Sequence, residues 1–453
     1  MSTASHSMTQ GRLGRQILLF SLPLMASNLL QVLFNMSDIA VVGRFAGPAA
    51  LGAVGSTSTL VTLFTGFLIG LGGGVNALVA RHYGAQDRDG INQTVSTALL
   101  VCLLFGAVLL GAGLGGARTL LELLHTKEEL LDGALRYLHI YFLGMPALAL
   151  YNYGNAVFSA FGQTRRPLIY LAAAGVLNIA LNLFFVIVCN LAEAGVAIAS
   201  VISQYLSGLL LLFDLLRGQK RYGLKIAPRC LSADSARSVL VLGVPAGLQN
   251  AIFAIANLFV QAGVNSFETV MVEGNAAASN ADGLVYDVMA AFYVACSSFM
   301  GQNLGAGNRD RVKKSYLISL AYSFGIGALL GLGLVLFGRT FLGLFTQDAA
   351  VAEAGMYRLR IMGFSYMVSA FMDCTIAASR GLGKSIVPTV IVILGSCVFR
   401  VVWVYTVFAW FGTIASLYLL YIFSWSITAA AEIFYFVRCY RRLSPAAPAP
   451  IAA

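Results

Sequence analysis

Twelve long apolar stretches constrain this chain more than any other feature of its sequence. Each holds roughly the 20 apolar residues that a helix needs to cross the hydrocarbon core of a bilayer. They lie near residues 17–43, 51–77, 93–116, 135–158, 168–190, 194–216, 239–263, 275–300, 315–337, 356–379, 386–411 and 413–437. We therefore predict an all-α polytopic membrane protein with twelve transmembrane helices.

The second six stretches repeat the first six at an almost constant separation along the chain. The pairs that show it are Gly84 and Gly305, Arg88 and Arg309, Gly162 and Gly383, Pro167 and Pro388, Pro23 and Pro245, and Asn28 and Asn250. Tandem six-span repeats are typical of secondary transporters, in which two similar bundles rock about a central site. Because each half has an even number of spans, both halves enter the membrane in the same direction.

The repeat also predicts the domain organisation. Residues 1–216 and 239–437 form two pseudo-symmetric six-helix lobes. Residues 217–238 form a basic cytoplasmic linker, which either lies on the anionic lipids of the inner leaflet or serves as a plain topology anchor. Residues 438–453 form a Pro- and Ala-rich cytoplasmic tail that we expect to be disordered.

Composition excludes a soluble protein and several classes of partner. The chain is 58% hydrophobic and 11% charged, against roughly 25% charged residues in soluble domains. The net charge of +10 comes from Lys and Arg residues concentrated in alternate inter-span segments, so it reflects topology and not a nucleic-acid site. The positive-inside rule predicts a protein of the cell membrane with both termini in the cytoplasm. The seven cysteines and four histidines form no cluster with metal-ligand or catalytic spacing, so we expect no enzyme and no cofactor.

One acid stands in the outer part of the first span. Asp38 is still followed by apolar residues, and an ionisable group at that depth is costly. We interpret it as a site for a proton or cation; the alternative is an interfacial residue at a helix end. Asn178 and Asn182, four apart in the fifth span, share one helical face. They can satisfy each other, or they can bond a carboxylate and tune its affinity for a proton or Na⁺.

The second half offers a parallel set of polar residues. Its candidate cation or substrate site consists of Asn250, Asp282, Asp287 and Asp373. Asp282 and Asp287 are five apart and cannot point the same way on a regular helix. A stripe with Tyr286 and Tyr293 on the face of Asp282 suits a cationic aromatic ligand, although helix packing explains it equally well.

Two further charges lie within the second-half spans. Arg400 can pair with Asp373 or with Glu432, and the sequence does not decide between them. Five glycines of the second span, at positions 66, 70 and 72–74, allow either close helix packing or bending.

Several motifs, in order, resemble those of the multidrug and toxic compound extrusion (MATE) family. They are Phe20-Ser-Leu-Pro-Leu, Asn28-Leu-Leu-Gln31, Asn35-Met-Ser-Asp38, Gly301-Gln-Asn-Leu-Gly-Ala-Gly-Asn308 and Arg380-Gly-Leu-Gly-Lys-Ser385. The likeness covers about residues 12–440 and points to the DinF/MepA-like branch of the MOP flippase superfamily.

The resemblance implies an antiporter that expels small cationic amphipathic compounds in exchange for H⁺ or Na⁺. Asp38 matches the family's first-span aspartate, with Na⁺ able to bind there, and Asn178 and Asn182 match its fifth-span polar pair. Members with two carboxylates there carry an aspartate at the position of Asn182, so this chain has one titratable group fewer. Asp373 resembles the tenth-span acid. No other metal is implied, and we expect a functional monomer surrounded by membrane lipid.

A lipid-linked oligosaccharide flippase of the same superfamily is the alternative. Such flippases more often carry several cationic residues in the cavity to meet a diphosphate, whereas here only Arg400 lies deep in a span.

Overall fold

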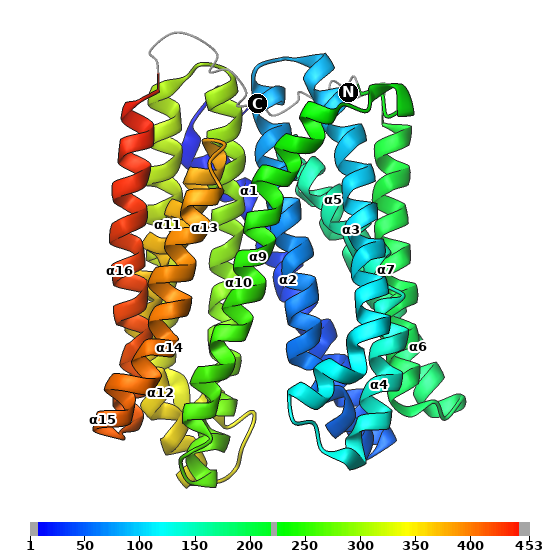
Figure 1. Ribbon diagram of the computed structural model, residues 1–453, viewed down its shortest axis with the longest axis vertical. Helices are drawn as coiled ribbons and strands as arrows, with labels where there is room; N and C mark the ends of the chain where they lie inside the picture. The colour runs from blue at the N-terminus through cyan, green and yellow to red at the C-terminus, as the bar shows by residue number, and fades with distance from the viewer. Residues whose placement is uncertain (1–7, 219–223, 444–453) are drawn as a thin grey trace. The chain divides into compact units, whose positions relative to one another are not determined.

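The computed structural model describes residues 8–218 and 224–443, in which all regular structure is helical (Figure 1). Residues 219–223 of the predicted linker and 444–453 of the predicted tail lie outside the described residues. The first half contains α1 (Leu13–Val41), η1 (Val42–Ala46), α2 (Pro48–Gly84), α3 (Arg88–Leu123), α4 (Glu128–Phe142), α5 (Met145–Ala160), α6 (Arg165–Leu183), η2 (Phe184–Val188) and α7 (Ala192–Arg217). The second half contains η3 (Pro228–Cys230), α9 (Ala233–Val264), α10 (Thr269–Gly305), α11 (Arg309–Leu342), α12 (Ala349–Gly381), α13 (Ile386–Val392), η4 (Ile393–Val398), α14 (Phe399–Trp403), η5 (Val404–Phe408), α15 (Ala409–Phe411) and α16 (Ile414–Arg441).

Eleven helices of the described chain are long and apolar enough to cross a membrane. The remaining predicted span, 135–158, is divided between α4 and α5, which have 15 and 16 residues. Pro146 lies in the first turn of α5, where its missing N–H costs no intrahelical hydrogen bond. Proline at that position would disrupt a continuous helix, which explains the break after Phe142. The prediction of an all-α polytopic membrane protein built from two six-helix lobes is confirmed.

The repeat seen in the sequence recurs in the helix boundaries. Each end of α10 is separated from the corresponding end of α2 by the same number of residues as Gly305 is from Gly84. The same separation relates the start of α11 to that of α3 and the start of α13 to that of α6. Gly162 and Gly383, the loop glycines of the two halves, share a φ of 78°, in the left-handed region where a Cβ would be strained. Equivalent positions of the two halves can therefore be compared residue by residue.

The described chain forms two compact units, each considered by itself. Unit 1 contains residues 26–251, and unit 2 contains residues 8–25 and 252–443, so both divisions fall inside helices, α1 and α9. In unit 2 the first part of α1 packs on α10, where the rings of Phe20 and Phe299 meet edge to face at 5.5 Å. In unit 1 residues 225–232 lie on α3, because Asn92 Oδ1 accepts from Lys225 N at 2.8 Å and Thr97 Oγ1 accepts from Ser232 N at 3.1 Å.

The second-span glycines serve close packing in unit 1. A Cβ on Gly70 would lie 2.4 Å from the backbone N of Gly247, and one on Gly74 would lie 2.5 Å from that of Gly243. The backbones of α2 and α9 thus approach each other where only glycine fits. Gly73, between them in sequence, has no neighbour within 4 Å of a Cβ.

Candidate functional site in the first lobe

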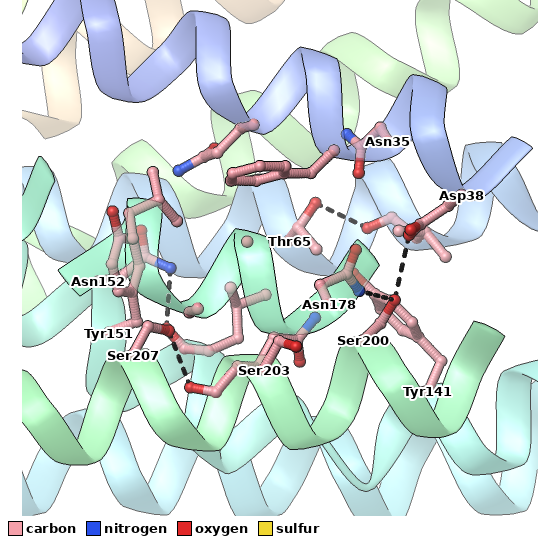
Figure 2. Close-up of a pocket in the computed structure, with 18 of the residues that line it drawn as sticks. Asn35, Asp38, Thr65, Tyr141, Tyr151, Asn152, Asn178, Ser200, Ser203 and Ser207 are labelled. Carbon is pink, nitrogen blue, oxygen red and sulfur yellow. Dashed lines mark hydrogen bonds between the residues drawn. The ribbon is translucent and has the colours of Figure 1, made fainter. Parts of the chain in front are cut away.

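A cavity of about 260 Å³ opens within unit 1 among α1, α2, α4, α5, α6 and α7 (Figure 2). Its lining combines polar residues with apolar and aromatic ones. The polar residues are Gln31, Asn35, Asp38, Thr62, Thr65, Asn152, Asn178, Ser200, Ser203, Gln204 and Ser207. The others are Phe34, Val61, Ile69, Tyr141, Leu148, Tyr151, Leu171, Ala174 and Gly175. This mixture of apolar walls and a few convergent polar groups is characteristic of small-molecule sites.

The three residues predicted for ion coupling lie together: Asp38 and Asn178 line the cavity, and the fully buried Asn182 bonds to both. Asp38 accepts hydrogen bonds from Asn182 Nδ2 and, at 3.1 Å, from Ser200 Oγ. Asn182 Nδ2 also donates to Asn178 Oδ1 at 3.2 Å, and Asn178 Nδ2 donates to Ser200 Oγ at 3.4 Å. The amide pair therefore does both things considered for it: its members bond each other, and one of them bonds the carboxylate. Their role in coupling stays a prediction.

The electrostatics of the cavity are dominated by Asp38. It is the one carboxylate among the lining residues, and neither Lys nor Arg lines the cavity. Two hydrogen bonds from neutral donors stabilise the carboxylate but leave its charge unbalanced, which is costly inside a membrane protein. A proton would remove that charge, and a hard cation held by the oxygen atoms of Asp38, Asn178 and Ser200 would balance it. Within the described chain no three His, Cys, Asp or Glu side chains gather into a metal site.

The sequence carried a signal for further lining residues that our predictions did not use. Gln31 and Asn35 precede Asp38 at helical spacing on α1. Ser200, Ser203 and Ser207 likewise recur at helical spacing on one face of α7. Only the packing of the helices shows that this face and the polar face of α1 line one cavity.

The four predicted second-half residues are divided between the two units. Asn250 belongs to unit 1, where its amide donates to the Gly66 carbonyl at 2.9 Å, whereas Asp282, Asp287 and Asp373 belong to unit 2. Asp282 accepts from Tyr366 and from Arg358, whose Nε lies 3.1 Å from Oδ2.

Arg358 neutralises Asp282 and belongs to a larger polar network. Arg358 lies near the start of the predicted span 356–379. Its side chain is buried, and Nη1 donates to Asn275 Oδ1 at 2.8 Å. A cation attracted to Asp282 would have to compete with the buried guanidinium of Arg358. In the predicted tyrosine stripe, the ring centres of Tyr286 and Tyr293 lie 6.2 Å apart.

Arg400 is fully buried in unit 2 and makes neither of the ion pairs considered for it. Among the described residues no carboxylate oxygen, including those of Asp373 and Glu432, lies within 4.0 Å of its guanidinium nitrogens. Its Nη1 donates instead to Asn257 Oδ1 at 2.6 Å. The expectation of an ion pair is therefore wrong, because the side chain lies against amide and aromatic groups.

The MatE family matches residues 23–184 and 245–406, once in each half of the chain. The chain belongs to this family. It is similar to the probable multidrug resistance protein YpnP of Bacillus subtilis (strain 168), with 30% identity over 365 residues, 80% of this chain and 81% of the relative. It is also similar to the probable multidrug resistance protein NorM of Thermotoga maritima, with 23% identity over 394 residues, 83% of this chain and 82% of the relative.

A solved structure of similar fold is an outward-facing multidrug resistance MATE family transporter of the MOP superfamily. Its TM-score is 0.89 at 21% identity, covering 97% of this chain and 99% of that one. This MatE-family chain is thus a membrane transporter of the multidrug efflux family and not an enzyme, as the sequence predicted. The relatives do not favour the flippase alternative.

Proposed function

We propose that this protein is a secondary antiporter that exports small cationic amphipathic compounds in exchange for H⁺ or Na⁺. The observation that carries the proposal is the cavity of unit 1, whose one carboxylate, Asp38, has no basic partner among the lining residues. A cavity of this polarity favours cationic over anionic cargo. Its Tyr141, Tyr151 and Phe34 side chains supply faces for a flat aromatic cation.

Coupling follows from competition for one negative charge. With Asp38 charged, the cavity attracts an organic cation; with Asp38 protonated or bound to Na⁺, that attraction is lost. The two states differ in the charge held between α1, α6 and α7, so the ion can bias the lobe between two packings. The substrate and the ion therefore bind to the same carboxylate at different times, as the exchange of one for the other requires.

Topology and assembly form part of the proposal. Both termini lie in the cytoplasm of the cell, on the side that holds most of the Lys and Arg residues of the inter-span segments. We also propose that the protein functions as a monomer embedded in lipid.

Ethidium efflux from proteoliposomes tests the proposal. An imposed pH gradient and an imposed Na⁺ gradient are applied separately, and we expect one of them to drive export. Asp38→Asn should abolish gradient-driven efflux, because an amide keeps the size of the side chain but can neither ionise nor bind the proton.

Asp89→Asn is the matched control. It makes the same chemical change at an exposed position in the first turn of α3, and we expect it to transport like the wild type. Gradient-driven efflux by Asp38→Asn at the wild-type rate would overturn the role of Asp38. If neither gradient drives export of any cationic dye by the folded, inserted wild type, the antiporter proposal fails as a whole.

A further inference from the structure

Three N–H donors that lie close together in unit 2 have no hydrogen-bond partner among the described residues. Arg400 is 0% exposed, and only its Nη1 has an acceptor, Asn257 Oδ1. Its Nε and Nη2 have none among the described residues, and neither does Nε1 of Trp425. The Arg400 guanidinium carbon lies 5.9 Å from the centre of the Trp425 ring, so the two side chains are neighbours. A buried donor without a partner is energetically costly, and more so when it is charged.

Aromatic rings cover the guanidinium without giving it an acceptor. Its carbon lies 4.4 Å from the ring centre of Phe253 and 4.7 Å from that of Tyr421. Cation–π attraction to these rings stabilises the positive charge. The in-plane N–H groups, in contrast, still require an oxygen or an anion. Asp282 is engaged by Arg358, and no carboxylate of the described residues forms an ion pair with Arg400.

The residues around Arg400 occupy positions that correspond, through the sequence repeat, to residues lining the cavity of unit 1. At the separation that relates the two halves, the matched pairs are Phe253 and Gln31, Asn257 and Asn35, Tyr421 and Ser200, and Trp425 and Gln204. All four first-half members line the cavity of unit 1. Equivalent positions in two repeats of one fold thus surround a ligand-sized space in one lobe and the Arg400 guanidinium in the other.

Charge is distributed differently over the counterpart positions of the two halves. Asp38 corresponds to Val260, so the first-lobe acid has no equivalent. Arg400 in turn follows Phe399, the counterpart of Asn178. The counterparts of Val61 and Asn152, which also line the first cavity, are the acids Asp282 and Asp373. An anion is therefore suited by the unpartnered guanidinium donors of Arg400 and not by the charge of the whole set.

The backbone around Arg400 is irregular. Helix α14 has five residues and lies between the π-helical turns η4 and η5. Such turns occur frequently at functional sites. The neighbouring Asn257 is exposed, so the polar end of the guanidinium borders an accessible side chain.

We propose that the second lobe binds a small monovalent anionic group through Nε and Nη2 of Arg400 and Nε1 of Trp425. The group is either a free halide or the carboxylate of a compound that the protein binds. Planar guanidinium donors suit a carboxylate in particular. The carboxylates of Asp373 and Glu432 lie beyond 4.0 Å from the guanidinium, so neither bonds this edge.

Binding of radiolabelled chloride to the purified, detergent-solubilised full chain tests the first source. Arg400→Gln should weaken binding by about 10-fold or more, since it removes the charge and the unpartnered guanidinium donors. Trp425→Phe should weaken it by a smaller factor, because it keeps an aromatic ring and removes one N–H donor. Arg339→Gln, which removes an exposed positive charge on α11, should bind chloride like the wild type. This assay needs no transport, so its outcome is independent of the antiporter proposal.

A rhodamine with a free carboxylate and its methyl ester test the second source. If a substrate carboxylate occupies the site, both variants should bind the acid more weakly than the wild type does and the ester equally well. A loss confined to chloride supports a free halide, and a loss confined to the acid dye supports a substrate carboxylate. The proposal is overturned if folded wild type binds neither chloride nor the acid dye, or if Trp425→Phe and Arg400→Gln bind both as the wild type does. Should Arg400→Gln fail to fold, Trp425→Phe alone decides.

Discussion

Two adjacent glycines of α2 allow a sharp test of the close packing described above. Gly74→Ala would bring a Cβ to 2.5 Å from the backbone N of Gly243, 2.6 Å from its Cα and 2.8 Å from the carbonyl carbon of Leu242. These are backbone atoms, so no side-chain rotation relieves the contact, and α2 and α9 must move apart. Gly73→Ala would meet nothing within 4 Å.

The comparison isolates the packing contribution to the free energy of unfolding. Each substitution replaces glycine by alanine in the interior of the same helix, which favours the helix by about 1 kcal/mol in both cases. That contribution cancels in the difference. Overpacking against rigid neighbours costs about 1–3 kcal/mol, so Gly74→Ala should be less stable than Gly73→Ala by that amount. For a unit of this size each kcal/mol corresponds to about 2–4 °C in melting temperature.

Thermal unfolding in detergent, followed with a thiol-reactive fluorophore, measures the difference. In a background that keeps Cys102 as its one cysteine, labelling reports the opening of unit 1, because Cys102 is buried there. We expect Gly73→Ala to melt at or above the wild-type temperature and Gly74→Ala several degrees below it. Gly70→Ala repeats the test at the second close approach. If the melting temperature of Gly74→Ala is as high as that of Gly73→Ala, the close backbone approach of α2 and α9 at Gly74 is refuted.

Three further predictions follow from single contacts. Gly90 N–H, bonded at 2.9 Å, is the largest influence that holds the pKa of Asp87 below its usual range. Asp87→Ala should therefore lower stability by about 1 kcal/mol through loss of the α3 cap. The charge-dependent part of that stability is present above the unfolded pKa and lost as pH falls through the folded one, so Asp87→Asn should flatten the acid limb of a melting-temperature profile. Arg358→Gln should cost about 3–5 kcal/mol because it leaves Asp282 unpaired inside the lobe, and adding Asp282→Asn should restore part of the melting temperature in a double-mutant cycle. Asn182→Ala should shift the ion concentration for half-maximal ethidium efflux by about 10-fold or more, since one hydrogen bond to a charged group is lost; an unchanged ion dependence would argue against its proposed role.

The membrane-spanning framework was predictable because it depends on local composition. Apolar stretches located every crossing, and the separation between the two halves of the sequence is reproduced by both ends of α2 and α10. The division of the fourth span into α4 and α5 was missed, since hydropathy does not register a proline. The Gly144-Met-Pro146 sequence carried that information.

The cavity was predictable only in part, for a physical reason. Helical periodicity places Asn178 and Asn182 on one face, and the cost of a buried charge identifies Asp38. Ser200, which bonds to Asp38, lies 162 residues away along the chain. Its contribution depends on how α7 is rotated and shifted against α1, and a single sequence contains no measure of that register.

Buried charges show the same limit more clearly. Arg358 lies near the edge of a predicted span, where a charged side chain is expected to reach water. Helix α12 begins earlier, at Ala349, so Arg358 lies inside the unit and forms an ion pair with Asp282. Arg400 stands in an apolar context, and the two partners considered for it from the sequence, Asp373 and Glu432, were both acidic. The structure instead gives it Asn257 and aromatic faces. The energetic cost of burying a charge predicts that the protein must stabilise it. Aromatic rings and amide groups can provide part of that stabilisation in place of an acidic partner. The donors that they leave unsatisfied indicate where a ligand has to supply the rest.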